Sequence, residues 1–201
     1  MRSIFRVGVL STALNCDRDH MPPFSTTDLK QWIADNKGLF NPPYKTNRVL
    51  AHHNEFIVMV LAGPNLRLDF HREAGEEFFQ QIYGDIELHL KPEGGPREVV
   101  EIRAGEIFLC PGGLAHSPRR PAGTWGLVIE RKRKPDELEQ FLWFCENCDE
   151  QVLARSVAPA EAAAEVRRIY ETFNADPAVR SCKKCGYVFP ATPIAERLSF
   201  L

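Results

Sequence analysis

Short hydrophobic runs dominate the middle of the chain, from Asn47 to about Arg133. Most are four to eight residues long and rich in Val, Ile, Leu and Phe, and turn-forming sequences with glycine or proline separate them. Such runs are typical of β-strands. Short, evenly spaced strands favour an antiparallel barrel, closed or built from two sheets, so the predicted fold class is all-β. The predicted strands are Arg48–His52, Glu55–Ala62, Asn65–His71, Glu77–Tyr83, Ile86–Lys91, Arg97–Arg103, Glu106–Cys110 and Trp125–Lys132.

Helices are predicted only on either side of this stretch. A short amphipathic helix is expected over residues 29–34, because side-chain oxygens at residues 26–28 can cap its first turn. Past Pro135 the strand pattern stops. A second helix is expected over residues 159–173, because proline is favoured in the first turn of a helix.

The charge balance limits the kinds of partner. The 201 residues include 25 Lys and Arg against 27 Asp and Glu, a net charge of -2, so the chain has no broad basic field to attract nucleic acid or anionic lipid. The longest apolar stretch, Phe56–Ala62, is far shorter than the roughly 20 residues of a membrane span. We therefore expect a soluble protein that binds small molecules, with no nucleic acid or membrane as partner.

Residues 1–20 form a separate N-terminal extension. They contain Arg2 and Arg6 and have no acidic residue before Asp17, as a targeting leader would. Met21 follows directly, so an upstream extension of a chain that starts at Met21 fits equally well. Both interpretations stay open, and no structure is predicted for this segment.

Four of the six cysteines form two Cys-x-x-Cys pairs, Cys145 with Cys148 and Cys182 with Cys185. This arrangement favours a reducing compartment, so a cytoplasmic location is expected. Four thiolates in two such pairs fit tetrahedral zinc or rubredoxin-type iron. Disulfides and redox-active dithiols are the alternatives, but a redox dithiol needs a βαβ context that this pattern lacks. Four cysteine ligands leave no open position on a metal, so the predicted site is structural or an iron store.

A second metal site is predicted from His71, Glu77 and His116. Iron(II) that binds both an organic substrate and O2 needs two imidazoles and a carboxylate on one face, with its other positions open. Each residue alone is weak evidence, but turn residues frame both segments. Glu76 competes with Glu77, and only one of them can reach the metal because adjacent strand residues point to opposite faces. The framing residues are Gly63, Gly84, Gly105, Pro111 and Gly113.

The two framed segments resemble the two sequence motifs of cupins, with Asp69 where many cupins have a further histidine ligand. From Trp32 to Tyr187 the chain also resembles the 3-hydroxyanthranilate 3,4-dioxygenase family. The resemblance implies Glu77 as the ligand, a cupin domain over residues 21–140, a rubredoxin-like metal-binding tail with a helix over residues 141–201, and a homodimer. Besides the cysteine pairs, the segments that carry this resemblance are Asn65-Leu66-Arg67-Leu68-Asp69-Phe70-His71, Glu76-Glu77-Phe78-Phe79, His116-Ser117-Pro118-Arg119-Arg120 and Val128-Ile129-Glu130-Arg131.

The resemblance also implies which residues bind the substrate. Arg67 and Arg120 match arginines of the family's substrate site, and a guanidinium fork suits a carboxylate. Glu130 matches the acid that orients the amino group and can accept a proton. Asn47 and Pro118 match further pocket positions. From the residue pattern alone, an arginine on a strand is usually solvated, and periodicity leaves open whether Glu130 faces inward or outward.

The implied activity is the opening of an aromatic ring. Both atoms of O2 would enter 3-hydroxyanthranilate at a catalytic Fe2+ ion, and the product would be 2-amino-3-carboxymuconate semialdehyde, the precursor of quinolinate. One alternative is the same chemistry on another ortho-aminophenol or catechol carboxylate. Another is a non-catalytic cupin that senses or stores a ligand, because fold alone does not fix activity.

Overall fold

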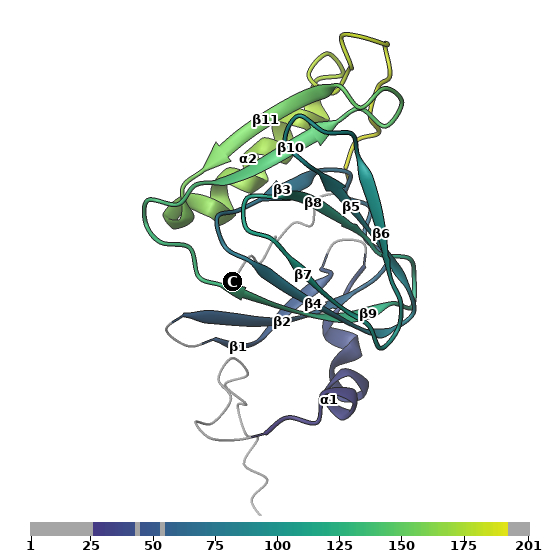
Figure 1. The fold of residues 1–201 in the computed structure, drawn as a ribbon, viewed down its shortest axis with the longest axis vertical. Helices are drawn as coiled ribbons and strands as arrows, with labels where there is room; N and C mark the ends of the chain where they lie inside the picture. Colours follow the sequence, from purple (N-terminus) through teal and green to yellow (C-terminus); the bar gives the residue numbers. More distant parts are fainter. Residues whose placement is uncertain (1–25, 43–44, 53–54, 193–201) are drawn as a thin grey trace, which may run out of the picture.

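Two antiparallel sheets face each other in the computed structural model (Figure 1), which describes residues 26–42, 45–52 and 55–192. The predicted N-terminal extension, residues 1–20, lies outside the described residues. The helices are α1 (Leu29–Asn36), η1 (Lys37–Leu39), η2 (Pro159–Glu161) and α2 (Ala162–Ala175). The strands are β1 (Asn47–His52), β2 (Phe56–Ala62), β3 (Phe70–Arg72), β4 (Glu77–Tyr83), β5 (Ile86–Lys91), β6 (Glu98–Ile102), β7 (Ile107–Cys110), β8 (Ala115–Arg119), β9 (Trp125–Arg131), β10 (Glu139–Phe144) and β11 (Gln151–Val157).

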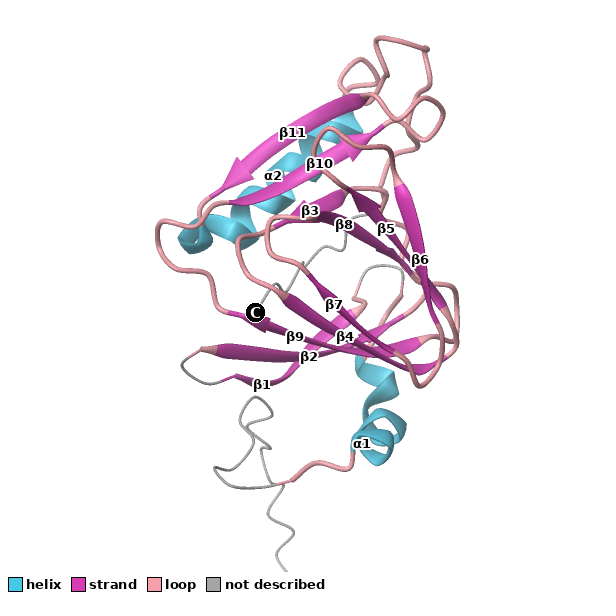
Figure 2. Ribbon diagram, in the orientation of Figure 1, coloured by secondary structure: helices cyan, strands magenta, loops and turns pink. Residues whose placement is uncertain are grey.

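The strand order confirms the predicted all-β class and its double-sheet form. The first sheet has the order β1-β2-β9-β4-β7, and the second has the order β11-β10-β3-β8-β5-β6. Figure 2 shows the two sheets as separate layers, with α1 beside the first sheet and α2 against β10 and β11 of the second. No helix of the described residues is long and apolar enough to cross a membrane.

One predicted strand is much shorter than expected. The prediction began at Asn65, whereas β3 covers only Phe70–Arg72. The Asn65 side chain donates to the backbone oxygen of Pro118 at 2.8 Å, and its backbone N–H donates to the oxygen of Arg120 at 3.0 Å. These hydrogen bonds pair polar groups of Asn65 without a strand ladder, which explains why the strand starts later than predicted.

The expectation that strands end at Pro135 is wrong, because β10 and β11 follow it. The alternation disappears in β10 because both of its faces are covered. Its residues Phe141 to Phe144 are all buried: Phe141 and Trp143 pack against α2, and on the opposite face Leu142 and Phe144 pack with residues of β3 and β8. Since β10 starts at Glu139 and pairs with β3, it crosses the predicted domain boundary between residues 140 and 141.

The strand β8 also escaped prediction, because Pro118 lies inside it. Proline cannot donate to a strand ladder and is therefore rare in central strands. Here β3 pairs with β8 only at His71 and His116, whereas Pro118 is paired with Leu88 of β5. Because β3 is so short, none of its residues is paired with Pro118. A proline can therefore lie in β8, although β8 is a central strand in the sheet order.

The helix α1 covers the outer face of the first sheet. It forms a cluster with Val60 and Leu127, and Ile129 packs against this cluster. The opposite face of β9 is apolar too, because Val128 belongs to the cluster between the sheets. Both faces of β9 are therefore hydrophobic, which is why periodicity could not tell which way Glu130 points.

The packing of α2 on β10 depends on aromatic side chains. Phe173 is fully buried and stacks on Trp143, with ring centroids 4.7 Å apart. Phe173→Ala should lower the free energy of unfolding by about 3–5 kcal/mol, because it removes a buried ring and leaves a cavity. Chemical denaturation measures this loss. Phe56→Ala, at a ring that is 52% exposed, is the control and should cost about 0.5 kcal/mol or less. Equal losses in the two variants would contradict this account of the helix.

Candidate functional site

Two pairs of residues on facing sheets build the centre of the site. His71 on β3 lies directly opposite His116 on β8, and Glu77 on β4 lies directly opposite Glu130 on β9. Residues paired directly across antiparallel strands point to the same face of their sheet. Each sheet therefore presents one pair to the space between the sheets.

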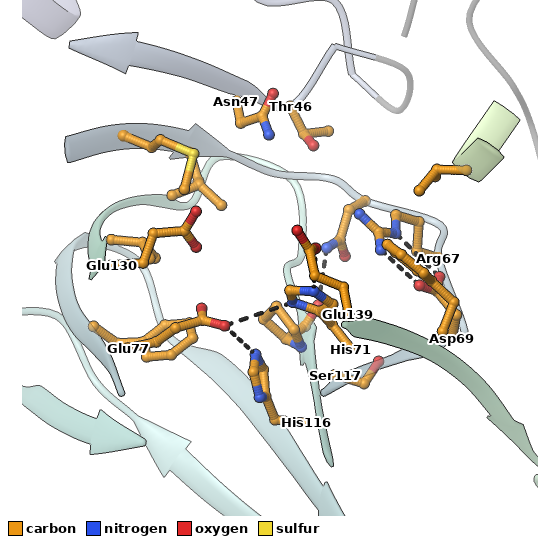
Figure 3. Close-up of a pocket in the computed structure, with 18 of the residues that line it drawn as sticks. Thr46, Asn47, Arg67, Asp69, His71, Glu77, His116, Ser117, Glu130 and Glu139 are labelled. Carbon is orange, nitrogen blue, oxygen red and sulfur yellow. Dashed lines mark hydrogen bonds and ion pairs between the residues drawn. The ribbon is translucent and has the colours of Figure 1, made fainter. Parts of the chain in front are cut away.

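The three predicted metal ligands meet in this space (Figure 3). Glu77 Oε1 lies 3.0 Å from His116 Nε2 and 3.6 Å from His71 Nδ1. One candidate ligand atom from each residue lies within 4.8 Å of the other two. Glu77 is buried and Glu76 is exposed, so the structure makes the choice that alternation along the strand could not.

Hydrogen bonds fix both imidazole rings. His116 Nδ1 lies 3.0 Å from the backbone oxygen of Leu114, to which only a protonated nitrogen can donate, so Nε2, which faces Glu77, is the nitrogen that can bind a metal once it has lost its proton. His71 Nε2 lies 2.8 Å from Glu139 Oε2. A second ring nitrogen that donates to a carbonyl or carboxylate is the usual arrangement of a metal-binding histidine.

Charge interactions dominate the titration of these groups in the metal-free protein. Burial alone would raise the pKa of Glu77, but the neighbouring His116 holds that pKa well below its usual range. Burial lowers the pKa of His71, but the carboxylates of Glu139 and Glu77 outweigh burial and raise it to about 9. The carboxylates therefore favour positive charge at this point, as a cation-binding site requires.

A cavity of about 180 Å³ opens beside the three ligands. An apolar cavity of about 150 Å³ is large enough to hold benzene, so this one can hold a single substituted aromatic ring. The predicted residues Asn47, Arg67, Pro118 and Glu130 all line it, but Arg120 does not. Apolar side chains form much of the remaining wall, namely Met59, Leu61, Phe79, Val128, Phe141 and Val166.

Three charged residues of the site were not predicted from the sequence. Arg133 and Glu139 line the cavity, and the buried Glu73 forms an ion pair with Arg133. Burial and the charge of Glu77 raise the pKa of Glu73 to about 8. Only the position of Glu73 two residues after His71, in the turn before Glu77, could have drawn attention to it. Glu139 opens a strand that was not predicted.

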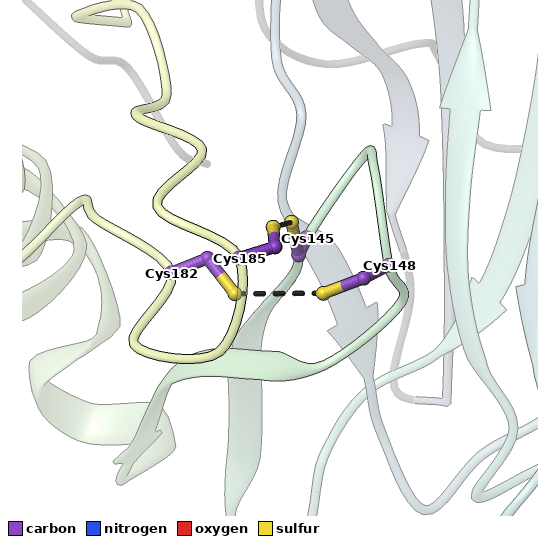
Figure 4. A group of neighbouring side chains, drawn as sticks. All are labelled: Cys145, Cys148, Cys182 and Cys185. Atoms are coloured by element: carbon purple, nitrogen blue, oxygen red, sulfur yellow. Dashed lines mark hydrogen bonds between the residues drawn. The ribbon is translucent and has the colours of Figure 1, made fainter.

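The four paired cysteines converge at the other end of β10 (Figure 4). The sulfur of Cys145 lies 3.5 Å from that of Cys185, and the sulfur of Cys148 lies 3.6 Å from that of Cys182. A tetrahedral metal at about 2.3 Å from each sulfur gives S–S distances of about 3.8 Å. All four cysteines are free thiols, so the disulfide alternative finds no support in the structure.

Both cysteine pairs have the same backbone turn. The N–H of Asp149 donates to the oxygen of Cys145 at 2.9 Å, and the N–H of Gly186 donates to the oxygen of Cys182 at 3.0 Å. Asp149 and Gly186 have positive φ, 59° and 77°, a conformation that glycine adopts without strain. Two such turns facing each other are a ready-made site for a metal with four sulfur ligands.

Comparison with known proteins identifies the family. The family model for 3-hydroxyanthranilic acid dioxygenase matches residues 21–174. This chain belongs to that family. The resemblance seen in the sequence motifs is therefore confirmed.

Similar proteins with the curated name 3-hydroxyanthranilate 3,4-dioxygenase occur in bacteria and fungi. The protein of Bacillus thuringiensis is 42% identical over 163 residues, which are 81% of this chain and 90% of that protein. The protein of Xanthomonas euvesicatoria is 36% identical, over 85% of this chain and 94% of that protein. The protein of Neurospora crassa is 35% identical, over 84% of this chain and 92% of that protein.

Among solved structures, a cupin-2 domain protein from Shewanella frigidimarina is similar to part of the chain. It aligns with a TM-score of 0.41 and 20% identity, over 49% of this chain and 91% of that protein.

Arg67, one of the two arginines implied by the family resemblance, lies at the cavity wall beside Asp69. Its Nε donates to Asp69 Oδ1 at 3.0 Å, and its Nη2 donates to Asp69 Oδ2 at 2.6 Å. Burial lowers the pKa of Arg67, but the Asp69 carboxylate more than offsets this, so the net pKa is raised. This bidentate pair holds the guanidinium in one orientation, and Asp69 is thus a partner of the arginine in a position where many cupins have a metal ligand.

Arg120, the second arginine, is buried behind the cavity. Its Nη1 donates to Gln81 Oε1 at 3.1 Å, and its Nε has no hydrogen-bond partner. Burial lowers the pKa of Arg120 to about 10. In the described residues no carboxylate forms an ion pair with it, so Arg120 is a buried cation without a counter-ion.

Gly126 on β9 sets the space that Arg120 occupies. A Cβ atom at Gly126 would lie 2.8 Å from Arg120 Nη1 and 2.9 Å from Gln81 Oε1. Gly126→Ala should therefore displace the guanidinium and lower the free energy of unfolding by about 1–3 kcal/mol, as other overpacked substitutions do. Denaturant titration measures the change. Gly38→Ala is the matched control, because a Cβ there meets nothing within 4 Å. If the two variants were equally stable, Arg120 would not be tightly held.

Proposed function

We propose that this protein opens the ring of 3-hydroxyanthranilate with O2 at an iron(II) ion held by His71, Glu77 and His116. The product would be 2-amino-3-carboxymuconate semialdehyde, which cyclises to quinolinate. The observation that carries this proposal is the convergence of the three ligands in one cavity with Arg67 and Glu130, in a chain of this family.

The residues fit the ion. Two imidazoles and one carboxylate are the set of ligands that non-haem iron(II) oxygenases use, with further positions open for substrate and O2. Glu77 Oε1 is buried and faces the two ligand imidazoles, at 3.0 Å from His116 and 3.6 Å from His71, so a cation bound between them would take the place of the protons that now lie there. Iron(II) bound there would bring the substrate and O2 together and carry electrons between them.

The protein itself would bind the substrate through two of its polar groups, the carboxylate and the amino group. Figure 3 shows Glu130 and Arg67 on either side of the two histidines. Asp69 uses two of the five N–H donors of Arg67, so the guanidinium has further donors with which it could bind the substrate carboxylate. Glu130 would accept a hydrogen bond from the amino group. The apolar wall would exclude water around the ring.

Glu130 is also suited to accept a proton when the substrate binds. Burial raises the pKa of Glu130, although Arg133 opposes this rise. A carboxylate with a raised pKa is a better base near neutral pH. Arg120 stays a proposed second partner of the substrate carboxylate, although its guanidinium contacts Gln81 in this structure and does not line the cavity. Asn47 and Pro118 would shape the pocket.

We assign the four cysteines to a structural zinc or iron site, since their turns and sulfur distances fit a metal with no open position. The homodimer, the cytoplasmic location and the division into a cupin domain over residues 21–140 and a metal-binding tail over residues 141–201 stay predictions.

Anaerobic loading with iron(II), followed by 3-hydroxyanthranilate in air, tests the activity. A new product band in the near ultraviolet is expected. His116→Ala should lose bound iron and lower turnover by more than about 100-fold, which exceeds the usual effect of removing an outer partner of a ligand. His89→Ala, on β5 and paired with Glu87, is the control and should behave like the wild type. An iron-loaded wild-type chain that forms no product would overturn the proposed activity.

Cys182→Ala separates the two metal sites. Loss of one of four sulfur ligands should release the metal and lower the melting temperature by about 4–8 °C, which corresponds to about 2 kcal/mol in a chain of this size. A single turnover with fully loaded iron at low temperature should be unchanged. Ser181→Ala, at the neighbouring half-buried residue, is the control. Loss of the first turnover in Cys182→Ala, with circular dichroism unchanged, would show that the cysteines take part in the chemistry.

A further inference from the structure

Arg133 lies among carboxylates that come from three different parts of the fold. Its guanidinium pairs with Glu73 of the turn between β3 and β4, with Glu130 of β9, and with Glu139 of β10. Nη1 lies 2.5 Å from Glu130 Oε1, and Nε lies 3.1 Å from Glu139 Oε1. The Arg133 side chain is only 10% exposed, so water screens these ion pairs weakly.

Two of these carboxylates lead directly to the reacting groups of the proposed function. Glu130 lines the cavity, where it would bind the substrate amino group. Glu139 contacts Arg133 with one oxygen and accepts from Nε2 of the metal ligand His71 with the other, at 2.8 Å. One guanidinium thus connects the substrate acid to the partner of a metal ligand.

The carboxylates would themselves attract a cation if Arg133 were absent. One oxygen from each of Glu73, Glu77 and Glu130 lies within 4.8 Å of the other two, and all three residues are buried. Buried carboxylates this close to each other take up protons, as the raised pKa of Glu73 shows, unless a positive partner compensates their charge. The partner that the structure provides is the guanidinium of Arg133, which pairs with Glu73 and Glu130 and leaves Glu77 to the histidines.

We propose that Arg133 is a positioning residue that holds Glu130 and Glu139 in place and acts as a built-in cation, so that only Glu77 of the neighbouring carboxylates serves the catalytic metal. The proposal rests on the proposed function. A guanidinium suits this task because its planar fork can serve several carboxylates at once, whereas a lysine ammonium is a single point of charge.

Arg133→Gln is the direct test. It should weaken iron(II) binding by about 10- to 100-fold, as loss of an outer partner of a metal ligand usually does, and raise KM for 3-hydroxyanthranilate more than it lowers kcat. Under excess Mn2+ the variant should bind one equivalent per chain more than the wild type, because the carboxylates have lost their cation. Arg133→Lys should restore the wild-type metal stoichiometry, but its KM should return only part of the way to the wild-type value. Anaerobic titration, elemental analysis and steady-state kinetics provide these values.

Arg131→Gln is the matched control. Arg131 lies two residues away and pairs with Glu137, which does not line the cavity, so this variant should match the wild type in metal binding and KM. If Arg133→Gln lowers only the melting temperature, with wild-type metal stoichiometry, iron affinity and KM, the role is merely structural and the proposal is wrong.

Glu139→Gln gives an independent measurement if Arg133→Gln does not fold. It keeps the shape of the side chain but removes the charge that faces Arg133, and it should also weaken iron(II) binding. In Arg133→Lys combined with Glu139→Gln, the two effects on iron affinity should not add, because both act on one ion-pair network. Additive effects would overturn the proposal. Because metal affinity is measured without turnover, these results stand apart from any failure of the proposed activity.

Discussion

The site depends on the register of two pairs of strands that face each other. His71 and His116 are direct partners on one sheet, and Glu77 and Glu130 are direct partners on the other. A shift of one residue in either register would turn a whole strand over and point its functional side chain away from the cavity. The helix α1 on the outer face of the first sheet and the packing of α2 on β10 matter for function because they support the strands that keep these registers.

The same arrangement concentrates negative charge in the interior, which is costly without compensation. Glu73, Glu77, Glu130 and Glu139 lie on or beside one small cavity, and Arg133 and the two imidazoles face them. The lowered pKa of Glu77 and the raised pKa of His71 express this balance. In the metal-bound protein the imidazoles must be neutral to act as ligands, so the bound cation takes over their share of the positive charge.

The sequence predicted the parts of the fold whose signals are local. Runs of β-branched and aromatic residues located eight strands, and the spacing of histidine, glutamate and cysteine led to both clusters of ligands. It missed β10 because a strand covered on both faces shows no alternation, and it missed β8 because Pro118 argued against a strand. The direction of Glu130 could not be read from β9, which is apolar on both faces. Glu139 and Arg133 come together only in three dimensions, so no spacing along the chain indicated them.

The strand β10 joins the two metal sites and explains why the cysteine cluster is more than a detachable tail. It begins at Glu139, whose carboxylate contacts His71, and it ends at Phe144, next to Cys145. Near its start it is held by the ladder with β3, and at its end Arg97 Nη2 donates to the oxygen of Phe144 at 3.0 Å and to that of Cys145 at 3.3 Å. A metal at the cysteines would therefore fix the far end of the strand, while the barrel ladder already fixes the end that reaches the cavity. Under the proposed function the cysteine site would accordingly contribute mainly to stability, and the chemistry would depend on the end of β10 that carries Glu139.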